Sequence, residues 1–83
     1  MSPEQFKRGR ERFEMTQTEF ASCLGLTQKT VSQYEIGFRK PGPTVQVIMF
    51  TLEALSDTQA KKLLELMRDV SDKLSRKRER RSR

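Results

Sequence analysis

The sequence predicts an all-α fold of five helices. Apolar residues recur at the three- and four-residue spacing of helices that bury one face. Side chains that cap helix starts come before these apolar runs, and glycine or proline comes after them. The 83 residues suffice for one small domain. Because so short a chain builds only a small core, a partner subunit would help to stabilise it.

The first helix is expected from about Pro3 to Phe13. Ser2 can cap its start, Pro3 suits the first helical position, and Gln5 can reach back to the cap. One face of this helix then carries Phe6, Arg10 and Phe13.

Two short helices follow. Thr16 and Glu19 form a capping-box pattern that opens the first of them, and Gly25 ends it because glycine readily adopts the left-handed conformation of a helix end. Thr27 caps the next helix, and Gly37 ends it. The apolar residues expected to hold these two helices together are Phe20, Ala21, Leu24, Val31 and Tyr34.

The fourth helix follows a loop, Arg39–Pro43, that is rich in proline and glycine. We expect Thr44 to cap this helix. The apolar residues of this helix form a broad stripe, which indicates that the helix is buried or lies at an interface. The stripe consists of Val45, Ile48, Leu52 and Leu55, and it is widened by Met49 and Phe50.

The fifth helix is expected to start at Ser56 or Asp57 and to cover about Thr58 to Ser75. Its inward-facing residues have the four, three, four spacing of a short heptad seam, and they are Leu63, Met67, Val70 and Leu74. Two interpretations stay open: the seam packs onto its own domain, or it joins two copies of the chain.

The formal net charge of +6 is concentrated at the end of the chain. Arg76–Arg83 holds six basic residues and one acidic residue, whereas residues 1–75 carry a balance of +1. We therefore expect a basic, flexible tail over residues 76–83 that favours a polyanionic partner. The alternative is a solvated end that only keeps the protein soluble.

Several kinds of site are not predicted. The sequence has no histidine and one cysteine, Cys23, which we expect to be a small apolar helix residue. We therefore expect no metal site and no disulfide, and no spacing of polar residues indicates an enzyme or a cofactor. No run of about 20 apolar residues and no apolar leader is found. We expect a cytoplasmic protein with no membrane partner.

The two short helices form a helix-turn-helix, because a glycine turn joins them and apolar residues fix their angle. The outer face of the second helix is then free to enter the major groove of DNA. Glutamine can pair there with adenine and lysine with guanine. Thr30 can make shorter contacts to bases or phosphates. The alternative is an ordinary solvated helix face. The candidates for base contacts are Gln28, Lys29, Ser32 and Gln33.

Residues 6–55, about three-fifths of the chain, resemble the lambda-repressor-like (Cro/repressor, or XRE) helix-turn-helix family. The match is specific, because capped helix starts, turn glycine, Glu-x-Gly ending and flanking proline all fall in register. The matching segments are Met15–Ala21, Leu24–Gln28, Val31–Gly37 and Pro41. The resemblance implies a five-helix lambda-repressor-like domain over residues 1–75, with its motif at residues 17–37. Pro43–Gln46 and Leu52–Leu55 are also faintly similar to anti-CRISPR-associated regulators.

The resemblance also implies residue roles. Arg10 and Glu35 would form the buried ion pair of the family, the alternative being that both face water. The residues that would face the bases are Gln28, Lys29, Ser32 and Gln33. The backbone around Ile36–Phe38 would also contact phosphates. The residues that would make the phosphate contacts are Gln17, Thr27, Thr30, Phe38, Arg39 and Lys40.

Two residues depart from the family pattern. Ile36 stands where the family usually has asparagine, and Phe38 stands where it often has lysine. Both changes remove polar groups from the loop that is expected to face phosphates.

These features predict a homodimeric, autoregulating repressor that reads an inverted repeat in double-stranded DNA through the helix Gln28–Ile36, in a prokaryotic or phage nucleoid. We favour dimerisation through the Leu63–Leu74 seam, because one recognition helix reads few base pairs and a two-fold pair reads two half-sites. The alternative is an antitoxin-type protein that neutralises a partner protein and binds its own promoter. A third possibility is non-specific compaction or RNA binding through the tail.

Overall fold

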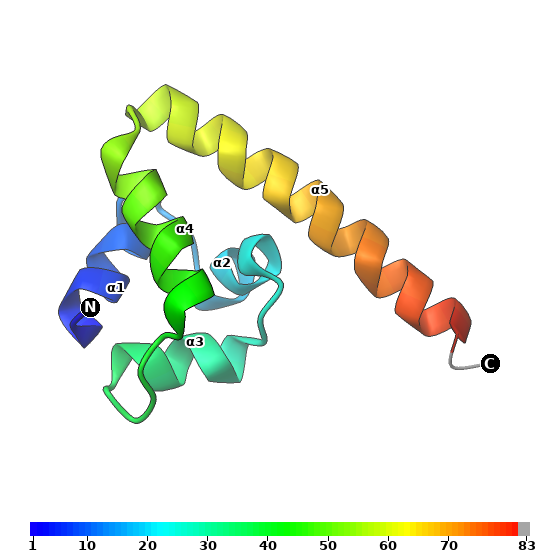
Figure 1. The fold of residues 1–83 in the computed structure, drawn as a ribbon, viewed down its shortest axis with the longest axis horizontal. Helices are drawn as coiled ribbons and strands as arrows, with labels where there is room; N and C mark the ends of the chain where they lie inside the picture. Colours follow the sequence, from blue (N-terminus) through cyan, green and yellow to red (C-terminus); the bar gives the residue numbers. More distant parts are fainter. Residues whose placement is uncertain (82–83) are drawn as a thin grey trace.

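The computed structural model describes the backbone of residues 1–81 and the side chains of residues 1–75. This part of the chain contains helices and no strand, which confirms the predicted all-α fold of five helices. In Figure 1, α1 to α4 form a cluster, while α5 runs beside α2 and extends past the cluster. The helices are α1 (Pro3–Glu11), α2 (Gln17–Leu24), α3 (Gln28–Glu35), α4 (Pro43–Ala54) and α5 (Asp57–Arg81).

The sequence predicts a single capping residue for each of the first four helices, and three of these four predictions are confirmed. Ser2, Thr16 and Thr27 each accept a hydrogen bond from the backbone N–H three residues later. The prediction that Thr44 caps α4 is wrong. Gly42 is the N-cap of α4, no side chain caps it, and Pro43 occupies the first turn. Proline suits this position because its fixed φ is helical and its missing N–H would have no helical partner.

The helix ends differ more from the expectation. The first helix stops at Glu11, two residues before the predicted end, and the turn after it places Glu14 at a φ of 56°. The fifth helix continues beyond Ser75 to Arg81, so the predicted start of the basic tail is not a helix end. The side chains of residues 76–83 and the backbone of residues 82–83 lie outside the described part of the chain, so the expected flexibility of this tail stays a prediction.

Aromatic side chains join the first three helices in one core. Phe6 on α1 packs edge-to-face against Phe20 on α2, with ring centroids 5.7 Å apart, and against Tyr34 on α3 at 5.3 Å. Phe6, Phe20 and Val31 are almost completely buried. Because α1 touches both motif helices through one ring, it fixes the angle between α2 and α3.

Arg12 connects α1 to the junction between α4 and α5. Its guanidinium donates to the carbonyl oxygens of Leu52 and Leu55 and to Oδ1 of Asp57, each at 2.8 Å. The two carbonyls belong to the C-terminal end of α4, where helical partners run out. Arg12 thus caps α4 and holds the first residue of α5 with one side chain.

The face of α5 that packs on the domain is not the predicted seam. Ala60 and Leu64 are completely buried, whereas Val70 and Leu74 are 55% and 53% exposed. The inward assignment of Leu63, Met67, Val70 and Leu74 is therefore wrong for its last two members, and its first two are only half-buried. The cause is that α5 meets the other helices through the face that carries Ala60 and Leu64, whereas Val70 and Leu74 line an open groove beside the turn between α2 and α3. Figure 1 shows α5 extending past the cluster. None of the described helices is both long and apolar enough to cross a bilayer.

Candidate nucleic-acid interface

The turn between α2 and α3 has the geometry that a helix-turn-helix requires. Gly25 adopts a φ of 70°, and the N–H of Leu26 bonds the carbonyl oxygen of Ala21 at 2.9 Å. Thr27 then starts α3, its hydroxyl accepting from the N–H of Thr30 at 3.2 Å and lying 2.9 Å from the hydroxyl of Thr30. Both threonines, which the resemblance assigns to phosphates, therefore already serve the start of α3.

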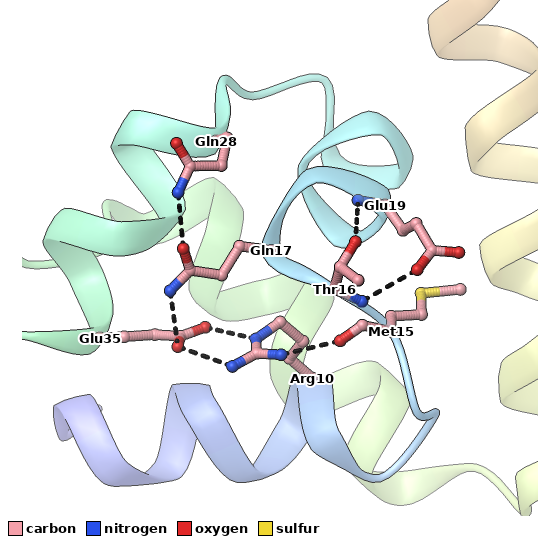
Figure 2. Close-up of polar contacts among 7 residues, drawn as sticks. All are labelled: Arg10, Met15, Thr16, Gln17, Glu19, Gln28 and Glu35. Carbon is pink, nitrogen blue, oxygen red and sulfur yellow. Dashed lines mark hydrogen bonds and ion pairs between the residues drawn. The ribbon is translucent and has the colours of Figure 1, made fainter.

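Arg10 and Glu35 lie in an ion pair that joins α1 to the end of α3. Nε of Arg10 is 2.7 Å from Oε2 of Glu35, and Nη2 is 3.0 Å from Oε1. The third nitrogen, Nη1, donates to the carbonyl oxygen of Met15 at 2.8 Å. The side chains of Arg10 and Glu35 are only 13% and 4% exposed. Figure 2 shows that this pair is the base of a longer chain of hydrogen bonds.

That chain leads from Glu35 to the first residue of α3. Nε2 of Gln17 donates to Oε1 of Glu35 at 3.1 Å, and Oε1 of Gln17 accepts from Nε2 of Gln28 at 2.6 Å. In Figure 2 the carboxamide oxygen of Gln28 points away from Gln17. No pattern in the sequence predicts the contact between Gln17 and Gln28, because it joins side chains eleven residues apart across the turn.

The ionisation of Glu35 is fixed by its neighbours. Burial alone would raise the pKa of the Glu35 carboxyl, but the hydrogen bonds from Arg10 and Gln17, with the charges of Arg10 and Lys7, outweigh burial and hold this pKa below its ordinary value. The hydrogen bond to Glu35 likewise raises the pKa of Arg10 against the effect of burial. At neutral pH, Glu35 is therefore a carboxylate that can only accept hydrogen bonds.

An acceptor at the base of the chain determines the orientation of both glutamines. Gln17 must present its NH₂ group to Glu35, so its oxygen faces Gln28. Gln28 must in turn present its NH₂ group to Gln17, which leaves its oxygen and its second N–H for another partner. This donor and acceptor pair is the one that adenine N7 and N6 require. The buried ion pair thus sets the polarity of a side chain at the start of α3.

The other predicted base-contact residues lie on α3 beside Gln28. Lys29 is exposed, and Ser32 and Gln33 are partly exposed, whereas Val31 and Tyr34 of the same helix are buried. The helix therefore has one face in the core and one polar face open to solvent. The structure brings the four residues together on one helix, without showing what they bind.

The loop after α3 differs from what the resemblance implies. The N–H groups of Phe38 and Arg39 both donate to the carbonyl oxygen of Gln33, at 2.9 and 3.2 Å. The N–H of Ile36 donates to the carbonyl oxygen of Ser32 at 3.1 Å. These backbone donors are occupied within the protein, so the exposed side chains of Arg39 and Lys40 are the cations left in this loop for phosphates.

A second surface, which we call the α5 groove, lies between α5 and the turn of the motif. It has a volume of about 710 Å³. Three of its α5 side chains are 53–63% exposed. The apolar residues that line both of its walls include Leu24, Leu26, Ile48, Leu66, Val70 and Leu74.

Comparison with known proteins supports the assignment of the motif. A family model described as helix-turn-helix matches residues 6–49, which are 44 of the 83 residues. The match covers most of α1, the motif and the first half of α4. This family is a DNA-binding domain and not a catalytic one. No curated protein and no solved structure matches the chain.

Proposed function

Because the chain belongs to the lambda-repressor-like (XRE) helix-turn-helix family of DNA-binding regulators, we propose that it is an autoregulating, homodimeric repressor that reads an inverted repeat in double-stranded DNA. Its recognition helix is α3. Bound across a promoter, the dimer would exclude the polymerase from the same DNA. Such a protein works where bacterial or phage DNA lies, in the cytoplasm.

The observation that carries this proposal is the chain of hydrogen bonds from Arg10 to Gln28. A side chain whose donor and acceptor are already oriented loses little conformational freedom when it binds a base. Gln28 would accept from adenine N6 and donate its second N–H to adenine N7. The second N–H of Gln17 is free of the Glu35 contact and would donate to the neighbouring phosphate.

The remaining contacts divide by chemistry. Lys29 and Gln33 have the long polar side chains that reach base edges, and Ser32 makes a shorter contact. Arg39 and Lys40 would bind phosphates beyond the end of α3. Phosphate contacts position the protein and add affinity that does not depend on sequence, whereas the contacts from α3 select the site.

The exposed side chains of α5 support the dimer. If two α5 helices pack antiparallel about an axis at Val70, Leu66 faces Leu74 of the partner subunit. Leu66, Val70 and Leu74 are more than half exposed in the single chain, and this pairing would cover them.

Selection from random duplex DNA tests the function. We expect the wild-type chain to enrich two inverted half-sites about one helical turn apart. Gln33→Ala and Lys29→Ala should each cost about 1–3 kcal/mol and relax one position per half-site. Lys61→Ala removes an exposed lysine of α5 and is the matched control for charge. Enrichment of no sequence, or equal binding by the Gln33, Lys29 and Lys61 variants, contradicts specific reading by α3.

Sedimentation equilibrium tests the dimer independently. Val70→Asp places two charges at the proposed axis and should give monomers, whereas Val47→Asp on α4, at a side chain that is 65% exposed, should not. Dimers that persist in Val70→Asp would move the interface away from α5.

A further inference from the structure

The turn after α3 carries the two most exposed large apolar side chains of residues 1–75. Ile36 and Phe38 are each 74% exposed, more than any exposed apolar residue of α4 or α5. Large apolar groups exposed in this way commonly mark a binding surface when they lie together. We call this pair, with Gly37 between them, the apolar turn.

The apolar turn is held firmly by the rest of the domain. Its N–H groups bond the carbonyl oxygens of the last turn of α3, including 2.9 Å from Phe38 to Gln33. Gly37 has a φ of 80°, and a Cβ there would lie 3.3 Å from Cγ of Pro3. The turn therefore packs against the start of α1. Phe38 is presented from an anchored backbone, so a partner that binds it need not first order a loop.

The chemistry on both sides of the apolar turn identifies its partner. The polar, base-reading face of α3 comes before it, and the exposed cations Arg39 and Lys40 follow it. A surface that alternates polar groups, an apolar group and cations matches a DNA strand, where apolar deoxyribose rings lie between anionic phosphates. An interface between protein subunits, in contrast, tends to have few charged residues at its centre.

We propose that Phe38, supported by Ile36, packs against the deoxyribose rings of the strand that borders the major groove, while Arg39 and Lys40 bind the phosphates on either side. This inference depends on the proposed function, because α3 must enter the groove for the turn to reach the strand. An apolar contact of this kind explains how the loop after α3 can bind DNA although Ile36 and Phe38 stand where the family often has polar residues and the backbone N–H groups of the loop are occupied within the protein.

The salt dependence of DNA binding separates an apolar contact from an ionic one. The probes are the duplex that wild-type protein enriches from random DNA and a random duplex of equal length. Phe38→Ala should weaken binding to the enriched duplex about tenfold at every salt concentration, with an unchanged slope of log affinity against log salt. Arg39→Gln should instead reduce the magnitude of that slope by about one. Val47→Ala, which shortens an exposed apolar side chain of α4, is the matched control.

The outcomes decide between the possible partners. Binding by Phe38→Ala that equals Val47→Ala, or a change of its salt slope, overturns the inference. If the effect of Phe38→Ala vanishes on a duplex with deoxyuridine in place of thymidine, Phe38 contacts a thymine methyl group and the sugar contact is wrong. If Phe38→Ala dissociates the dimer in sedimentation equilibrium, the turn binds a second copy of the chain and the inference is again wrong.

Failure of the proposed function gives a different pattern. In that case selection enriches no sequence, and Gln33→Ala binds the random duplex as well as the wild type does. If only the inference fails, Gln33→Ala still loses discrimination between the two duplexes while Phe38→Ala behaves as the wild type.

Discussion

Replacement of Arg10 by methionine removes the cation beside Glu35 and keeps an unbranched apolar side chain in its place. The variant loses two hydrogen bonds to Glu35 and one to the carbonyl oxygen of Met15. Glu35 is only 4% exposed, so its carboxylate would stay buried without a counter-charge. Breaking a buried pair in this way costs about 3–5 kcal/mol. Because Arg10 is 13% exposed, we expect the lower end, about 3 kcal/mol.

Urea unfolding followed by circular dichroism measures this loss of the free energy of unfolding. In a domain of this size, about 3 kcal/mol corresponds to a fall of about 12–24 °C in Tm. Arg8→Met is the matched control, because Arg8 is an exposed arginine of the same helix and should change stability by less than about 0.5 kcal/mol. The double variant Arg10→Met/Glu35→Leu, which removes both charges, should recover much of the loss. Equal stabilities of the Arg10→Met and Arg8→Met proteins would refute the reasoning.

Three further predictions concern Glu35, Arg12 and Gly25. The pKa of Glu35 lies below its ordinary value, so its carboxylate stabilises the fold at pH values above the unfolded-state pKa of about 4.3. This contribution should be lost as the pH falls further through the folded-state pKa. The difference in the free energy of unfolding between the wild type and Arg10→Met should therefore shrink below about pH 4 in acid titrations. Arg12→Met should cost about 1–2 kcal/mol in urea unfolding. The carbonyl oxygen of Leu55 loses its guanidinium donor, and that of Leu52 keeps only the N–H of Leu55 at 3.2 Å. Asp57→Asn should cost less than about 0.5 kcal/mol because the Asp57 side chain is 73% exposed. Gly25→Ala should cost about 1–2 kcal/mol through its φ of 70°, since the added Cβ would meet nothing closer than Ser71 Oγ at 3.9 Å. Gly42→Ala, at a φ of −71° with open space around it, should cost less by the same measurement, because only the preference of an N-cap for glycine over alanine is lost.

Local chemistry explains which parts of the fold were predictable. Ser2, Thr16 and Thr27 cap helices through contacts only three residues long, and Gly25 ends α2 through its own backbone conformation. Such signals are complete within a few residues of sequence. At α4 two local signals compete, a threonine and a proline, and the proline at position 43 determines the start.

The orientation of α5 was not predictable in the same way. The helix carries four large apolar residues within five positions, Leu63, Leu64, Leu66 and Met67, so several faces of it could be buried. Which face is buried depends on α2 and on the junction that Arg12 holds. Leu64 is completely buried, while Leu66 is 63% exposed. The exposed face that remains is the one on which the dimer proposal depends.

The candidate site shows the same division between residue types and their arrangement. Glutamine and lysine on the polar face of α3 could be recognised from the sequence, and the family pattern pairs Arg10 with Glu35. The step that joins these two groups, Gln17 between Glu35 and Gln28, arises only when α2 and α3 are placed at their observed angle. The buried ring of Phe6 fixes that angle, so the packing of the core also determines how the proposed base-contacting side chains are oriented.

Stability and base reading can therefore be separated at the ion pair. A buried ion pair is often replaceable by apolar residues without loss of stability, so Arg10→Met/Glu35→Leu should remain folded and dimeric. Gln17 would then have no carboxylate to orient its amide, and Gln28 would be free to present either end to a base. We expect this double variant to bind the enriched duplex more weakly and to discriminate less against a change of the base pair that Gln28 reads, with other positions unaffected. Wild-type discrimination by a stable double variant would mean that the DNA itself, and not Glu35, orients Gln28.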